Sequence, residues 1–102
     1  MILTILEAHV DAGKESALQS AFATAIASNE RPPGLLRSQL IRDAFDPTRW
    51  RIQTWWESRE ALTAMRAAGV PPAGILMFRA AGAEPATSIF EVVHELGAVP
   101  AR

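Results

Sequence analysis

Hydrophobic and polar positions repeat with two different periods along the chain, and the period indicates the type of each element. Residues 2–10, 35–42 and 49–56 are rich in β-branched or aromatic residues and are bounded by turn residues, which is typical of strands. Residues 14–28 place apolar side chains three and four positions apart, as an amphipathic helix does. The pattern predicts strands over 2–10, 35–42, 49–56 and 87–96, a helix over 14–28, a helix that starts after an N-cap at Ser58 and ends before 69–74, and a short helical segment over 75–81.

The order of these elements is βαββαβ, which predicts the fold class. A strand–helix–strand crossover is almost always right-handed, so both crossovers bring their helices to the same side of the sheet. We therefore predict an α+β, ferredoxin-like fold: a four-stranded antiparallel sheet with its helices on one face. The 102 residues suit a single domain, residues 1–102, with 97–102 as a frayed tail.

Composition adds that this sheet carries more apolar surface than its own helices can cover. Of the residues, 49% are hydrophobic and three are Trp. In the third strand, Trp50, Ile52, Thr54 and Trp56 point to one face, whereas Trp55 points to the other. One layer of helices covers one face only, so we expect a homodimer packed sheet to sheet, with further apolar surface lining a cavity.

Charge and composition exclude several classes of function. The net charge is −1 and the basic residues are scattered, which argues against a nucleic-acid partner. The chain has no Cys, and neither a metal-ligand spacing nor a phosphate-binding glycine loop occurs in the sequence. Residues 1–9 are apolar but too short for a signal peptide or a membrane span. We therefore expect a soluble, cytoplasmic protein without a membrane partner or a bound metal.

The segment from Pro33 to Leu62 carries a series of short motifs. In order, they are Pro33-Gly34, Arg42-Asp43, Asp46-Pro47, Trp56 followed by Glu57-Ser58, and Glu60-Ala61-Leu62. Their order and spacing resemble those of the antibiotic biosynthesis monooxygenase (ABM) family. The resemblance implies a dimeric α+β barrel with a pocket between sheet and helices in each subunit. Family members include oxygenases that convert phenolic polyketide intermediates to quinones without metal or flavin. Others degrade heme, and many have no settled substrate.

The resemblance also implies site residues. Trp56 matches the Trp that borders the substrate pocket, where an indole stacks on a fused aromatic ring; the alternative is a core Trp. Arg79 would face a substrate anion. The remaining pocket positions are Ile52, Thr54, Leu62, Met65 and Phe78. At the first four, relatives carry Asn, an acidic residue, Tyr, and His or Trp. Heme-degrading relatives also have a heme-ligating His in the region that here reads Ile75-Leu76-Met77-Phe78. These replacements argue against heme, and the resemblance implies no cofactor.

Both histidines, His9 and His94, fall late in the first and last predicted strands. These strands are antiparallel neighbours in the predicted sheet, so the two imidazoles would lie at opposite ends and would not share a metal ion. Each has an acidic neighbour, Glu7 or Glu95, and with it a histidine can act as a proton acceptor. The alternative for both is an ordinary surface or interface histidine.

Three functional hypotheses follow. The first is a cofactor-independent monooxygenase that acts on a hydrophobic aromatic molecule, with Trp56 stacked on the ring, Arg79 at the anion, and His9 or His94 as the base. The second is a non-catalytic domain that binds a small hydrophobic or aromatic ligand. The third is a structural dimer whose pocket is filled by Leu, Met and Phe side chains.

Overall fold

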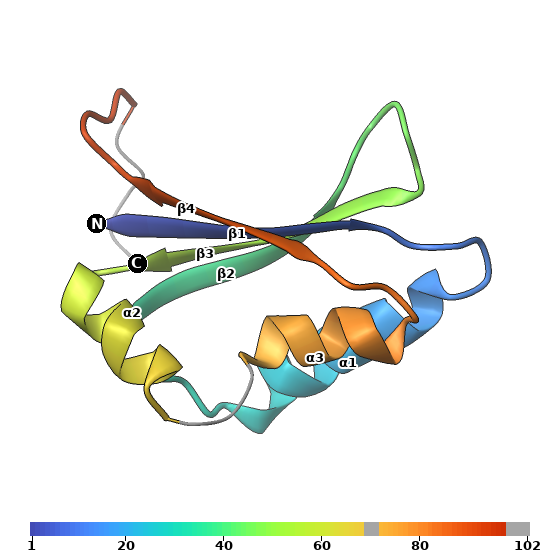
Figure 1. The fold of residues 1–102 in the computed structure, drawn as a ribbon, viewed down its shortest axis with the longest axis horizontal. Helices are drawn as coiled ribbons and strands as arrows, with labels where there is room; N and C mark the ends of the chain where they lie inside the picture. Colours follow the sequence, from blue (N-terminus) through green and yellow to red (C-terminus); the bar gives the residue numbers. More distant parts are fainter. Residues whose placement is uncertain (69–71, 98–102) are drawn as a thin grey trace.

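The computed structural model describes residues 1–68 and 72–97, and it confirms the ferredoxin-like α+β fold. The elements are β1 (Ile2–His9), α1 (Glu15–Ser28), β2 (Leu35–Arg42), β3 (Arg49–Trp56), α2 (Arg59–Arg66), α3 (Ala73–Ala80) and β4 (Ala86–Glu91). The strands form one antiparallel sheet in the order β2-β3-β1-β4. Figure 1 shows all three helices below this sheet. Of the predicted frayed tail, residues 98–102 lie outside the described part of the chain.

Local sequence explains where the helices begin and end. The hydroxyl oxygen of Ser58 accepts a hydrogen bond from the backbone N–H of Ala61, which confirms the predicted N-cap of α2. Helix α1 ends because Asn29 adopts a left-handed backbone conformation with φ of 60°. Helix α3 begins directly after Pro72 and covers the region of the predicted short helical segment.

The core is divided into two clusters beneath the sheet. The larger one joins Leu6, Val10, Leu18, Trp50, Ile52, Phe78 and Ala81, where α1 and α3 pack against each other and α3 packs on β1. The smaller one joins Ile2, Trp56 and Leu62, where α2 packs on β3. Because the helices gather at opposite ends of the sheet (Figure 1), its middle is left without a helix pressed directly against it.

The last strand is shorter than predicted, since β4 ends at Glu91 rather than at residue 96. Its ladder with β1 ends at the pair Ile2–Glu91, and one further bond joins Val92 N–H to the carbonyl of Met1. A strand needs a partner for its backbone groups, and residues 93–97 form no ladder with β1, which starts at Ile2.

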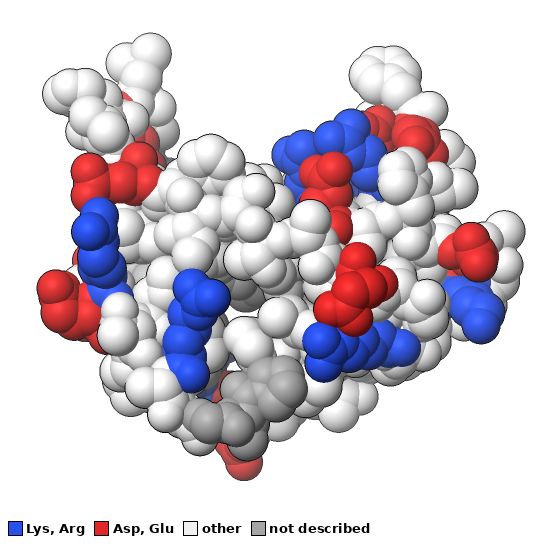
Figure 2. Space-filling model, viewed as in Figure 1, with Lys and Arg blue, Asp and Glu red and all other residues white. Residues whose placement is uncertain are grey.

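Within residues 1–68 and 72–97, no helix lies over the upper face of the sheet (Figure 1). Side chains alternate along a strand, so Leu3 and Ile5 of β1, Trp55 of β3 and Phe90 of β4 point to this helix-free face. The guanidinium carbon of Arg37 lies 4.1 Å from the centroid of the Trp55 ring. Figure 2 shows two projections rising above this face, one at the β2–β3 turn and one beyond β4, with mostly uncharged surface between them.

Candidate functional site

A cavity of about 370 Å³ lies between the sheet and the helices, next to both core clusters. This volume falls within the usual range of small-molecule sites. The side of the cavity that the sheet forms is called its floor, and it includes Thr4, Leu6, Ser38, Ile52, Thr54 and Trp56. The opposite wall includes Phe22, Ile26, Leu62, Met65, Ile75 and Met77. The cavity is therefore mainly apolar, with a small number of polar groups on the floor.

Those polar groups are hydroxyls that the strand register brings together. Ser38 of β2 lies opposite Thr54 of β3, which in turn lies opposite Thr4 of β1. The hydroxyl oxygens of Ser38 and Thr54 are 2.9 Å apart, and Thr4 donates a longer bond of 3.4 Å to the Thr54 carbonyl. Sequence reasoning found Thr54 but missed Thr4 and Ser38. Their signal was present, because alternation along the strands places both on the helix side.

Trp56 lines the cavity and also belongs to the core, so it occupies both of the environments considered for it, the pocket and the core. Its side chain is 3% exposed and packs with Ile2 and Leu62. The indole N–H donates to the hydroxyl of Thr4 over 3.3 Å, which fixes the orientation of the ring. The indole is thereby held within the core, and a small part of its surface borders the cavity.

The structure brings most predicted pocket residues together, but Phe78 is an exception. Ile52, Thr54, Leu62 and Met65 all line the cavity with Trp56. The side chain of Phe78 is fully buried in the larger core cluster, where it does not border the cavity. Phe78 is therefore part of the core, and the structure does not place it among the residues that line the cavity.

Arg79 is also directed away from the cavity. Its guanidinium binds the Glu84 carboxylate through two bonds of 2.8 and 3.0 Å, and this contact lowers the pKa of Glu84. The cavity lining contains two other arginines, Arg31 and Arg66. Arg66 sits in the last turn of α2, one position after Met65, so the arginine that sequence reasoning assigned to the site is replaced by a nearer one.

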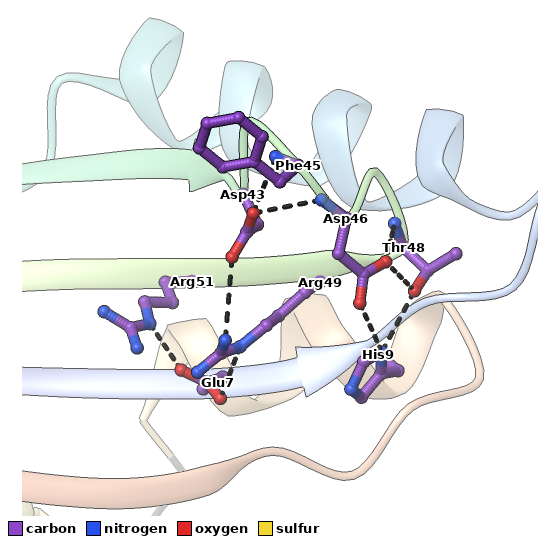
Figure 3. A network of polar contacts seen from close by, with 8 residues as sticks. All are labelled: Glu7, His9, Asp43, Phe45, Asp46, Thr48, Arg49 and Arg51. Carbon is purple, nitrogen blue, oxygen red and sulfur yellow. Dashed lines mark hydrogen bonds and ion pairs between the residues drawn. The ribbon is translucent and has the colours of Figure 1, made fainter.

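His9 lies on the helix-free side of the sheet, as Figure 3 shows, and not in the cavity. Its Nδ1 is 3.0 Å from the Thr48 hydroxyl and 3.8 Å from an Asp46 carboxylate oxygen. Thr48 donates its own proton to Asp46 at 2.7 Å, so Nδ1 of His9 acts as the donor to Thr48. His9 lies outside the cavity because side chains alternate along β1: His9 shares its face with Glu7, whereas Leu6 faces the helices.

The carboxylate that was expected beside His9 is engaged elsewhere. Glu7 accepts a bond of 2.9 Å from Arg49 and another from Arg51, and Arg49 also approaches Asp43 at 3.6 Å (Figure 3). The bond from Arg49, followed by that from Arg51, lowers the pKa of Glu7. Glu7 is therefore an ionised bridge between two strands and not the acidic partner of a histidine base.

His94 lies beyond the end of β4, exposed to solvent and outside the cavity lining. The prediction that it belongs to the last strand is wrong, for the reason given by the pairing of β4. Within residues 1–68 and 72–97, no group of three His, Asp or Glu side chains is placed to hold a metal ion. None of the helices described is both long and apolar enough to cross a membrane.

Comparison with known proteins supports the family resemblance. The sequence profile described as antibiotic biosynthesis monooxygenase matches residues 1–69. No curated protein sequence matches the chain. Among solved structures, a protein described as an antibiotic biosynthesis monooxygenase from Deinococcus radiodurans superposes with a TM-score of 0.74 at 13% identity, covering 97% of this chain and 99% of that one.

Two further structures carry functional descriptions. SnoaB from Streptomyces nogalater, described as a cofactor-independent oxygenase, has a TM-score of 0.71 at 18% identity and covers 95% of this chain and 97% of its own. The heme-degrader MhuD from Mycobacterium tuberculosis, solved with two hemes in its active site, has a TM-score of 0.67 at 29% identity, with coverage of 95% and 100%. At 18% identity, the likeness to SnoaB shows the fold alone.

Proposed function

The chain belongs to the antibiotic biosynthesis monooxygenase family, and on that premise we propose that it oxidises a hydrophobic aromatic molecule bound in the cavity beneath its sheet. One observation carries the proposal: an indole and a row of hydroxyls face an otherwise apolar space of about 370 Å³. An aromatic ligand with a polar edge matches both parts of that lining. The description of SnoaB as a cofactor-independent oxygenase agrees with this chemistry.

The proposed reaction needs no external reductant when the substrate is an electron-rich phenol. One atom of O₂ enters the ring as a carbonyl oxygen and replaces a ring hydrogen. The other atom leaves as water with that hydrogen and the phenolic hydrogen. The substrate loses four electrons and O₂ gains four, so phenol and O₂ give quinone and water. The protein then has to orient the ring, exclude bulk water and stabilise the phenolate that donates the first electron.

Three side chains of the lining suit these tasks. The Trp56 indole stacks on the ring, and the guanidinium of Arg66 stabilises the phenolate in the role first assigned to Arg79. Among the described lining residues Glu30 is the only carboxylate, so it takes the role of proton acceptor instead of His9 or His94. Both Glu30 and Arg66 are exposed, which gives the released proton a short route to solvent.

Heme is a poor fit to this set of residues, although MhuD is described as a heme-degrader. Proteins hold heme iron through His, Cys or Tyr, or through Met together with His. The described lining offers the thioethers of Met65 and Met77 and neither His, Cys nor Tyr. We therefore derive no step that passes through heme.

We also propose that the protein works as a homodimer joined through the helix-free face of the sheet. Leu3, Ile5, Trp55 and Phe90 form an apolar surface there, and none of the helices in the described part of the chain covers it (Figure 1). Sedimentation should find a dimer at micromolar concentration for the native chain and a monomer for Trp55→Glu. Gln19→Glu, which adds the same charge on the exposed surface of α1, should remain a dimer. A native chain that is monomeric would refute this arrangement.

The enzyme is tested with 1-naphthol and anthrone in aerated buffer that contains a chelator. Oxygen uptake and quinone absorbance should rise with protein concentration. Trp56→Leu should lower the rate about tenfold or more, since the stacking contact is lost. Trp55→Phe is the matched control, because this neighbouring Trp faces away from the cavity and Phe keeps its apolar ring.

A second function, binding without chemistry, is favoured by one observation. The described part of the cavity lining contains no His, Tyr or Asn, the residue types that would ordinarily assist phenol oxidation. Quenching of Trp fluorescence by 1-naphthol with no oxygen uptake would establish the binder and refute the oxygenase. The open cavity argues against the third hypothesis, a dimer whose pocket is filled by its own side chains.

A further inference from the structure

The Ser38 and Thr54 hydroxyls carry two protons, and only one of them is donated to an acceptor in the structure. Each group carries a single proton, and one of the two forms the 2.9 Å bond between the oxygens. The Thr4 hydroxyl receives the Trp56 indole N–H and donates to the Thr54 carbonyl, and no bond joins it to either hydroxyl of the pair. Within the described residues, neither Ser38 Oγ nor Thr54 Oγ1 has any other hydrogen-bond partner. One O–H therefore remains free to donate.

That free donor is located on the floor of the cavity. Ser38 and Thr54 both line it and are partly buried, with the apolar side chains of Leu6 and Ile52 nearby. A hydroxyl in such surroundings gains little from bulk water, so an oxygen atom on a ligand is a better partner. Either hydroxyl of the pair can be the one that donates, because each rotates about its own C–O bond.

We propose that the Ser38–Thr54 pair recognises a keto, phenol or phenolate oxygen on the edge of a fused aromatic ligand whose rings lie against Trp56. This inference rests on the proposed function, because it names the group by which the same cavity selects its aromatic ligand. Thr54 and Trp56 are two residues apart on one face of β3, which separates their attachment points by about 7 Å. That spacing favours a ligand of two or three fused rings over a single-ring phenol.

The pair also offers more to an anion than to a neutral ligand. A hydrogen bond to an ionised oxygen is shorter and stronger than one to a neutral oxygen. The free O–H therefore holds phenolate more tightly than phenol and assists ionisation of the substrate from the floor of the cavity. The hydroxyl pair thus acts both in specificity and in positioning.

The test compares 1-naphthol with naphthalene, which shares the fused rings and lacks the oxygen. Binding is measured by quenching of Trp fluorescence, and the native chain should bind 1-naphthol about tenfold more tightly. The double variant Ser38→Ala/Thr54→Val should weaken 1-naphthol binding about three- to tenfold and change naphthalene binding less than twofold, which is the effect of one lost hydrogen bond. Each single variant leaves one hydroxyl whose proton is no longer used within the pair, so it should keep the preference for 1-naphthol. Ser38→Ala/Thr54→Ser, which keeps one hydroxyl, should restore the preference.

Controls remove hydroxyls elsewhere. Thr63→Val on α2 and Ser20→Ala on α1 make the same chemical changes at exposed positions outside the cavity lining, and they should leave both affinities unchanged. Far-UV circular dichroism of every variant reports folding. If the double variant fails to fold, the ratio of the native chain's affinities for 1-naphthol and naphthalene still decides the question.

The outcomes separate this inference from the proposed function. Equal affinity of the native chain for the two ligands, or equal weakening of both in the double variant, overturns the role of the hydroxyl pair even if 1-naphthol is oxidised. A preference that the double variant abolishes, with no oxygen uptake, supports the hydroxyl pair and removes the oxygenase. Failure of both ligands to bind overturns both.

Discussion

Gly34, which precedes β2, has both a left-handed backbone conformation and a close contact with α2, whereas Gly13 has the left-handed conformation alone. Its φ is +83°, and a Cβ built on it would collide with the Cβ of Ala61 and lie 3.2 Å from Glu57 Cγ. Gly13 has a φ of +89°, but a Cβ there would meet nothing within 4 Å. Replacing each with Ala therefore imposes the same backbone strain, whereas only Gly34→Ala adds a steric clash.

The two costs can be assigned from these contacts. A left-handed conformation costs a residue with a side chain about 1–2 kcal/mol, and this applies to both variants. The Ala61 Cβ is attached directly to α2 and cannot rotate away, so the clash adds about 1–3 kcal/mol of overpacking. We expect Gly13→Ala to lose about 1–2 kcal/mol of unfolding free energy and Gly34→Ala about 2–5 kcal/mol.

Urea unfolding followed by Trp fluorescence measures this difference. All samples should have the same protein concentration, because association alters apparent stability. With a typical urea slope, the midpoint of Gly34→Ala should lie about 1 M below that of Gly13→Ala. Coincident midpoints would show that α2 moves freely away from the start of β2 and would refute the close packing inferred here.

Three further changes test other parts of the molecule. Gly74→Ala places a Cβ 2.6 Å from Leu6 Cδ1, so the Leu6 side chain, which lines the cavity, has to move. Calorimetry should show about tenfold weaker 1-naphthol binding, with stability changed by less than about 1 kcal/mol. Glu7→Gln removes a carboxylate whose pKa in the folded state is lowered below 4.5 by Arg49. The stability that this ionised carboxylate contributes is present above pH 4.5 and is lost as the pH falls through the folded-state pKa. The urea midpoints of the native chain and the variant should therefore converge in acid. Phe78→Ala should cost about 3–5 kcal/mol in urea unfolding, as expected for a fully buried ring.

The alternation of side chains was enough to predict one half of the site and could have prevented one error. It correctly placed Ile52, Thr54 and Trp56 on the helix side of the sheet. The same rule puts His9 on the opposite face, together with Glu7, so the histidine could have been excluded as a base from the sequence alone. The mistake arose from considering which residues can transfer protons before considering which face each one occupies.

The errors at Phe78 and Arg79 have a different origin. Helix α3 is apolar on nearly every side, so its sequence does not indicate which side faces the cavity. The packing of α3 against α1 and β1 turns Phe78 into the core, leaves Met77 on the cavity, and directs Arg79 outward to Glu84. Only the arrangement of the helices resolves that choice.

The periods of hydrophobic residues, the turn residues and the order of elements by themselves determined the strands, the helices and the ferredoxin-like topology, because these depend on local preferences and on the handedness of crossovers. The tertiary structure decided where the cavity lies and which polar groups meet in it. Thr4, Ser38 and Thr54 are far apart in the chain, and their contact depends on the register of three strands. A slip of one residue would turn an entire strand's hydroxyls to the other face, and that register is set by packing over the whole sheet.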